Sequence, residues 1–262
     1  MDTILDQPQQ PINERRSIED VLQNGYSLSI GNVWNRGADI WKKNIGGFLL
    51  YFIVGSIIMN VVGLIPIAGI VATWFVLGPV FSAGFYIAAY AITKNGTVAA
   101  NDYTIGFRKM IDNALYVLLS LIILALVFIP VMMSLFASLA FLLKADYKSA
   151  DSIREVFSIL APVVGIIAAC IALAMLVYVL LIMVYPLIHI YGLSAIDAIR
   201  VSARTVIKQY FTFIILMFTL LLLNVGGAIC LLVGMLFTIP LSYCILYAAY
   251  ESIFEPTTST NS

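Results

Sequence analysis

The sequence predicts an all-α, polytopic integral membrane protein that crosses the bilayer about six times, as three helical hairpins. Composition, long uncharged stretches and the placement of basic residues support this prediction. Of the 262 residues, 62% are hydrophobic and 11% are charged, against roughly half and a quarter in ordinary globular proteins. A soluble chain of this composition could not cover its surface with polar groups.

The chain divides into three regions. Residues 1–30 are polar and lack the apolar h-region of a secretory signal, so we expect a disordered N-terminal tail. Residues 31–254 form the predicted membrane domain, whose first span must itself direct insertion. Residues 255–262 are expected to be a disordered C-terminal tail.

The first two spans lie between Lys43 and Lys94, where no charged residue occurs. This gap is too long for one span, because about 20 residues cross the hydrocarbon core. The segment Gly63-Leu64-Ile65-Pro66 breaks it near the middle. The expected spans are 45–63 and 67–93.

The remaining spans lie in three further uncharged runs. Residues 113–143 are the predicted span 3, and residues 156–196 hold one span, with two as the alternative. A single helix over residues 209–250 would be about 60 Å long, twice the core thickness. This run must therefore fold back, and we expect the turn at residues 224–227, Asn-Val-Gly-Gly.

Basic residues are concentrated on one side of the six-span arrangement. Eleven lie in loops of one side, and the other side holds three: Lys144, Lys148 and Arg154. Because Lys and Arg accumulate in cytoplasmic loops, both termini are predicted to be cytoplasmic and the 144–155 loop outside. An arrangement with five or seven spans would no longer place most of the basic residues on one side.

A short amphipathic segment precedes each odd-numbered span. The apolar positions are Trp34, Ala38, Trp41 and Ile45 before span 1, Tyr103, Phe107, Met110 and Ala114 before span 3, and Ile196, Ile199, Ala203, Val206 and Tyr210 before span 5. Such segments lie at the membrane surface with basic groups facing anionic lipid. Plain anchoring of the loops is favoured over a specific lipid-recognition site.

The first and last hairpins resemble a parallel internal repeat, with chance similarity as the alternative. Residues 38–44 correspond to residues 203–209. The other matched positions are Asn60 with Asn224, Gly63 with Gly226, Pro79 with Pro240, and residues 88–90 with 248–250.

Two matched pairs predict a site at helix kinks. Pro79 and Pro240 are predicted to kink spans 2 and 6 around a central polar site, because proline frees a backbone carbonyl one turn earlier. Asn60 and Asn224 lie nearer the outer turns, where they cap a turn or bond across helices. The favoured alternative is that both prolines are structural kinks.

No catalytic, cofactor-binding or metal-binding pattern occurs in the sequence. A single histidine, His189, cannot build a zinc site. The net charge of zero argues against nucleic acid as a partner. No Asp, Glu, Lys or Arg lies in the middle of a predicted span, which argues against a proton-coupled transporter.

Four segments carry a resemblance to known proteins. They are Leu77-Gly-Pro-Val-Phe-Ser-Ala-Gly84, Asn101-Asp-Tyr-Thr-Ile-Gly-Phe107, Tyr185-Pro-Leu-Ile-His-Ile-Tyr-Gly192 with Ala198-Ile-Arg-Val-Ser202, and Thr238-Ile-Pro240 through Tyr250. With these segments the chain resembles a broad group of uncharacterised bacterial multi-pass inner-membrane proteins, which includes the membrane domain attached to some glycerophosphodiester phosphodiesterases. The resemblance implies a bacterial cytoplasmic membrane. It implies no phosphodiesterase activity, because the soluble enzyme domain is not in this sequence.

These observations predict a non-enzymatic membrane protein that binds membrane lipid or another membrane protein. The alternative is a small permease or transport subunit for a neutral solute or lipid. An enzyme is the least favoured class, and the sequence does not indicate the oligomeric state.

Overall fold

The computed structural model describes residues 15–142, 150–230 and 233–255, and it confirms the all-α membrane fold. Every regular element within these ranges is helical. In the described part of the chain, six helical stretches are long and apolar enough to cross a membrane: Ile45–Gly63, Ala68–Asn95, Ala100–Ala140, Ala161–Tyr191, Ala195–Ile229 and Met235–Phe254. The segment 156–196 therefore holds one candidate span.

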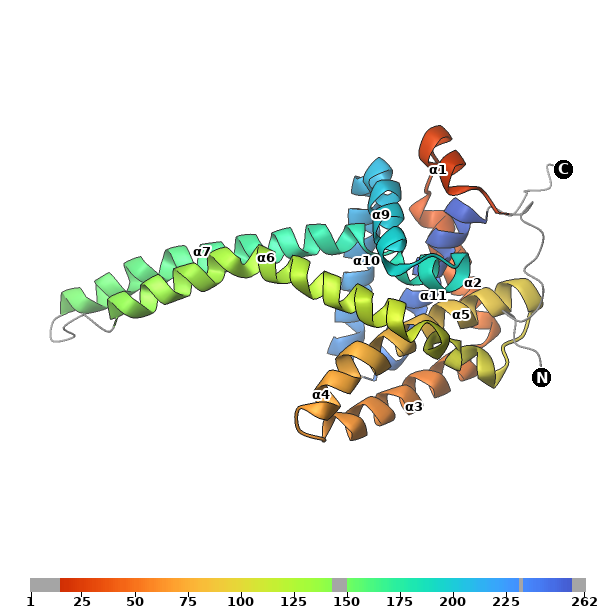
Figure 1. Ribbon diagram of the computed structural model, residues 1–262, viewed down its shortest axis with the longest axis horizontal. Helices are drawn as coiled ribbons and strands as arrows, with labels where there is room; N and C mark the ends of the chain where they lie inside the picture. Colours follow the sequence, from red (N-terminus) through yellow and green to blue (C-terminus); the bar gives the residue numbers. More distant parts are fainter. Residues whose placement is uncertain (1–14, 143–149, 231–232, 256–262) are drawn as a thin grey trace. The chain divides into compact units, whose positions relative to one another are not determined.

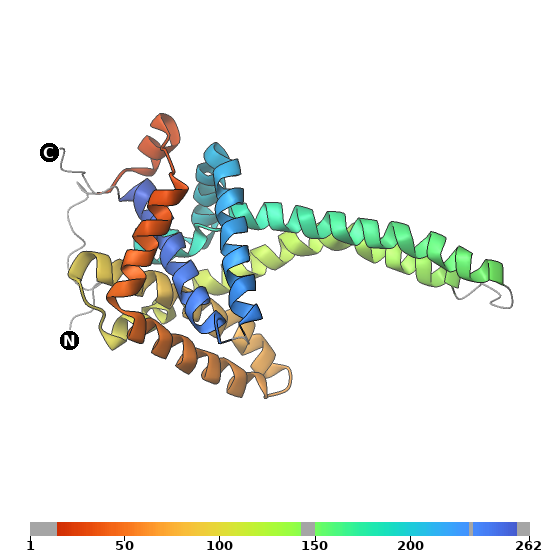
Figure 2. The same cartoon turned by 180° about the vertical axis from the view of Figure 1, so that it is seen from behind.

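The chain forms two compact units, of which the second runs from Leu118 to Tyr178. This unit consists of parts of α6 (Met110–Leu142) and α7 (Ala150–Leu180), which run side by side in opposite directions (Figures 1 and 2). Large apolar side chains such as Met133 and Phe136 are exposed along it. Lipid is the natural surrounding for such a surface.

The first unit contains the rest of the described chain. Its elements up to residue 109 are α1 (Ile18–Asn24), α2 (Ile30–Lys43), α3 (Ile45–Gly63), α4 (Ala68–Ala72), the π-helix η2 (Thr73–Leu77), α5 (Gly78–Asn95) and the 3-10 helix η3 (Ala100–Lys109). The later elements are α8 (Val184–Pro186), the π-helix η4 (Leu187–Tyr191), α9 (Ala195–Val206), the 3-10 helix η5 (Ile207–Gln209), α10 (Tyr210–Ile229) and α11 (Met235–Phe254).

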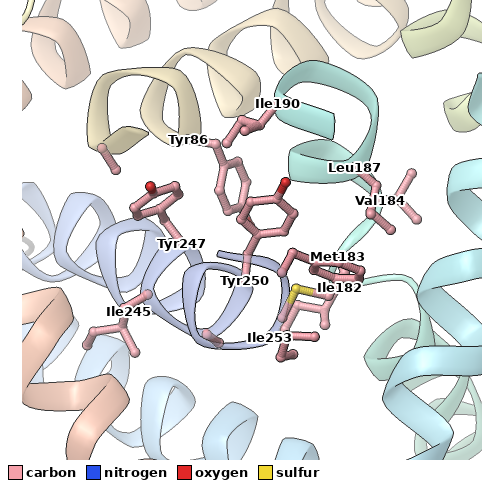
Figure 3. Close-up of a cluster of buried hydrophobic side chains, with 14 of the residues drawn as sticks. Tyr86, Ile182, Met183, Val184, Leu187, Ile190, Ile245, Tyr247, Tyr250 and Ile253 are labelled. Carbon is pink, nitrogen blue, oxygen red and sulfur yellow. The ribbon is translucent and has the colours of Figure 1, made fainter. Parts of the chain in front are cut away.

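The core of the first unit is built around α11, which packs against α2, α3, α5 and α10. Tyr247 and Tyr250 of α11 are fully buried. Figure 3 shows Tyr250 between Tyr86 of α5 and the segment that carries Met183 and Leu187, and Tyr247 beside Tyr86, away from that segment. Large aromatic side chains thus hold the ends of several helices together, since each buries a large apolar area.

The predicted turn at residues 224–227 is wrong. α10 continues through Asn224 and Gly227 to Ile229, and α11 starts at Met235. A Cβ on Gly227 would meet Thr238 Oγ1 at 2.6 Å. The glycine therefore serves close approach of α10 and α11, and the helix persists because its backbone groups must stay paired within lipid.

Parts of both expected tails belong to the folded structure: the end of the N-terminal tail and the start of the C-terminal tail. α1 lies within residues 1–30, and its Val21 is fully buried. Ser17 caps α1 by accepting a hydrogen bond from the backbone N–H of Asp20 at 3.0 Å. Glu255 is also buried. Residues 1–14 and 256–262 lie outside the described residues.

The segments before the odd-numbered spans are helical, but their predicted apolar faces are only partly right. α2 buries Val33, Gly37, Ile40 and Trp41, and it packs on α11. α9 buries Ala198, Val201 and Ser202 among others, whereas Ile196 is exposed. Of the predicted apolar positions in these two segments only Trp41 and Val206 are buried, so the face that packs against protein is offset from the predicted one.

The two halves of the predicted repeat share one backbone feature. α2 and α3 are separated by Asn44, with φ −150° and ψ 51°. Its predicted counterpart Gln209, which precedes α10, has φ −131° and ψ 42°. The same bend thus joins a short helix to a span in both halves.

Candidate functional site

The two predicted kink residues are buried, at different places in their helices. Pro79 is the second residue of α5 and follows the π-helix η2. Pro240 is the sixth residue of α11. The two helices pack together, and Ser82 Oγ lies 3.0 Å from the hydroxyl of Tyr243.

The two predicted asparagines do different things. Asn60 Nδ2 donates to the backbone oxygen of Ser56, 2.8 Å away within the same helix. Asn224 Nδ2 donates to Leu220 O at 2.8 Å and also to Ser242 Oγ at 2.9 Å, which joins α10 to α11. Among the described contacts, none gathers these asparagines and the two prolines into one site.

An apolar groove of about 390 Å³ lies between α3, η2, α5 and η3. Its walls are formed by hydrophobic and aromatic side chains with almost no polar surface. They include Leu50, Val54 and Ile58 of α3, Phe81 of α5, and Tyr103 and Phe107 of η3. A groove of this size and chemistry lies within the range of ligand sites.

Aromatic contacts and glycines fix the wall of this groove. The Tyr51 hydroxyl donates to the backbone oxygens of Phe81 at 3.2 Å and Tyr103 at 3.3 Å. The Tyr51 and Tyr103 rings stack with centroids 4.4 Å apart. A Cβ on Gly55 would lie 2.0 Å from Phe81 Cε2, so only glycine lets the Phe81 ring pack there.

The sequence analysis named Tyr103 and Phe107 in an amphipathic segment, and it included further lining residues only within segments that resemble other proteins: Leu77, Val80, Phe81 and Thr104. It predicted no groove. One available signal was the spacing of Gly47, Tyr51 and Gly55 in span 1. Residues four apart lie on one helix face, and all three line the groove.

A partly buried ionic cluster joins α2, α5, α11 and the N-terminal segment. It consists of Arg15, Arg36, Lys94, Glu251 and Glu255. The guanidinium of Arg36 makes two hydrogen bonds of 2.8 Å to the Glu251 carboxylate. Glu255 pairs with Arg15 Nε at 3.0 Å and Lys94 Nζ at 3.3 Å. The hydrogen bonds to Glu251 raise the pKa of Arg36 above its ordinary value.

A polar crevice of about 380 Å³ lies beside the ionic cluster. It is lined by Ser27, Ser29, Asn32, Arg36, Glu251, Ser252 and Glu255, together with two apolar residues. The crevice thus combines hydroxyl groups with both signs of charge. Within the described ranges, no group of three or more His, Cys, Asp or Glu side chains could hold a metal ion.

Comparison with known proteins gives no relative: no protein family, curated protein or solved structure matches this chain.

Proposed function

We propose that this chain is a non-enzymatic, lipid-binding protein of a bacterial cytoplasmic membrane. Its groove between α3, η2, α5 and η3 holds an acyl chain of one lipid. The apolar lining of that groove is the observation that carries the proposal.

The groove is suited to an acyl chain by its position as well as its lining. α3 is one of the six candidate spans, so its exposed side chains face hydrocarbon. Leu50, Val54 and Ile58, which line the groove, are 64%, 45% and 47% exposed. Water would find almost no hydrogen-bonding partner in such a groove.

Basic residues next to the groove favour a lipid with an anionic headgroup. Lys42 and Lys43 are exposed at the end of α2, and Gly47 of the groove lies one helical turn further along the chain. A basic residue near an anionic membrane surface contributes about 1 kcal/mol. The proposed lipid therefore places its phosphate near Lys43 and its chain along α3.

Contacts between the two chain ends support the proposed orientation. The backbone N–H of Arg16 donates to Phe254 O at 2.9 Å, and Arg15 pairs with Glu255. The described ends of the chain thus share one side of the membrane, as an even number of crossings requires. The excess of basic residues on that side supports a cytoplasmic location.

Two neighbouring substitutions on α3 test the proposal. Val54→Trp fills the groove, whereas Ile53→Trp adds the same bulk outside it; Ile53 is 41% exposed and is not a lining residue. Native mass spectrometry of gently solubilised protein would measure retained phospholipid. We expect Val54→Trp to lower retention about tenfold, which corresponds to about 1.4 kcal/mol of lost packing, and Ile53→Trp to leave it unchanged.

Equal retention by both variants and the unchanged protein would contradict the proposal. Retention of a protein subunit in place of lipid would favour a partner-binding role for the same surface.

A further inference from the structure

The side chain of Arg15 is held by groups from three different elements. Its Nη1 donates to Ile190 O of η4 at 3.0 Å, and its Nη2 donates to the Tyr90 hydroxyl of α5 at 3.1 Å. Its Nε pairs with Glu255, which follows α11, at 3.0 Å. The guanidinium carbon also lies 5.8 Å from the centre of the Tyr90 ring.

This arrangement matches a guanidinium better than an ammonium group. A planar guanidinium presents several N–H donors in fixed directions, whereas an ammonium is a compact point charge. Here two guanidinium nitrogens donate hydrogen bonds and the third lies in an ion pair with Glu255. An aromatic ring supplies a further favourable contact. Burial alone would lower the pKa of Arg15, yet Tyr250, Glu255 and Tyr90 raise it above its ordinary value.

A second observation indicates a site that a ligand could reach. Glu255 forms part of the wall of the polar crevice; its side chain is 1% exposed and that of Arg15 is 22% exposed, so the space that Arg15 fills is open on the side of the arginine. The Tyr250 hydroxyl is buried and has no hydrogen-bond partner in the described part of the chain. Figure 3 shows it pointing toward η4, the helix that carries Ile190.

We propose that Tyr90, Ile190 O and Glu255 form a binding site for a guanidinium-bearing ligand, which Arg15 occupies as an internal substitute. An external guanidinium compound enters from the partly exposed side of Arg15 and takes the place of the Arg15 side chain. The proposal does not depend on lipid binding in the apolar groove, which has no residue in common with the site.

Chemical rescue of Arg15→Ala tests this site on the full chain in detergent. Methylguanidinium chloride is added at millimolar concentration, with methylammonium chloride and sodium chloride at matched ionic strength. We expect Arg15→Ala to unfold at a lower temperature than the unchanged protein. Methylguanidinium should restore the midpoint in a saturable way, because a ligand that binds only the folded state stabilises it.

Selectivity and matched variants decide the outcome. Methylammonium should bind about tenfold more weakly, because it loses at least one hydrogen bond from a charged donor to the Tyr90 hydroxyl or the Ile190 carbonyl. Arg16→Ala is the control, since the Arg16 side chain bonds only Asp20 and Gly25 among the described contacts, and methylguanidinium should not raise its midpoint. Tyr90→Phe in the Arg15→Ala background should weaken the rescue.

If Arg15→Ala does not fold, Arg15→Lys replaces it, since it keeps the charge and loses the planar donor group. Methylguanidinium should then raise the midpoint of Arg15→Lys as well. Equal rescue by all three salts, or no rescue of either variant, would show that Arg15 makes only a structural ion pair and would overturn the proposal.

Discussion

At the residue scale, single glycines determine how closely the helices of the first unit approach. A Cβ on Gly37 of α2 would lie 2.5 Å from the Cα of Ile245 in α11. A backbone atom cannot move aside as a flexible side chain can, so the two helices would have to separate. Gly31 lies in the same helix, and a Cβ there would meet nothing within 4 Å.

Gly37→Ala should therefore destabilise the protein by about 1–3 kcal/mol, as expected for overpacking. Gly31→Ala should be neutral or stabilise it by up to about 1 kcal/mol, because glycine is the less favourable residue in a helix. Thermal unfolding in detergent measures both changes. If Gly37→Ala were as stable as Gly31→Ala, the close contact between α2 and α11 would be wrong.

At the element scale, hydrogen bonds distinguish the two matched asparagines. Asn224 joins α10 to α11 through Ser242, whose Oγ also donates to Thr238 O at 2.7 Å. This bond to Thr238 lies in the same turn as Pro240, where proline removes a backbone donor. Asn60 bonds within its own helix and is exposed. The resemblance between the hairpins therefore does not extend to this contact.

Asn224→Ala should destabilise the α10–α11 pair by about 1 kcal/mol, the usual contribution of a hydrogen bond between membrane helices. Asn60→Ala should have little effect, because it removes no contact between helices. Unfolding of both variants in a denaturing detergent titration measures the difference. Adding Ser242→Ala to Asn224→Ala should cost less than the sum of the single changes, since both remove the same bond. Strict additivity would show that the bond contributes nothing.

At the scale of the whole molecule, the positions of the chain ends constrain the topology. The contacts of Arg15 and Arg16 with Glu255 and Phe254 place both described ends together. The basic residues then predict that this side is the cytoplasmic one, because eleven of the fourteen lie in the loops assigned to it.

Two reporter fusions check this orientation. An enzyme that is active only outside the cytoplasm should be active when fused near Lys148 and inactive when fused after Ser262. The opposite pattern would reverse the orientation. Activity at both positions would mean an even number of crossings between Lys148 and the C-terminus, instead of the odd number that six spans require.

Local features of the sequence were enough to predict the fold class and the approximate positions of the spans. The uncharged run between Lys43 and Lys94 predicts two spans because a charge inside hydrocarbon is costly. The turn after α10 could not be found in this way. Asn224 and Gly227 have the composition of a turn, but their roles depend on Ser242 and Thr238 of the next helix.

The sequence by itself determined that this chain is helical, that it crosses a membrane about six times and which loops carry the positive charge. These properties depend on residues close together in the chain. Only the tertiary structure decided where the functional candidates lie. The groove joins α3 to η3, and Glu255 meets an arginine from the opposite end of the chain. Such pairings depend on how the helices pack, because partners far apart in sequence leave no periodic signal.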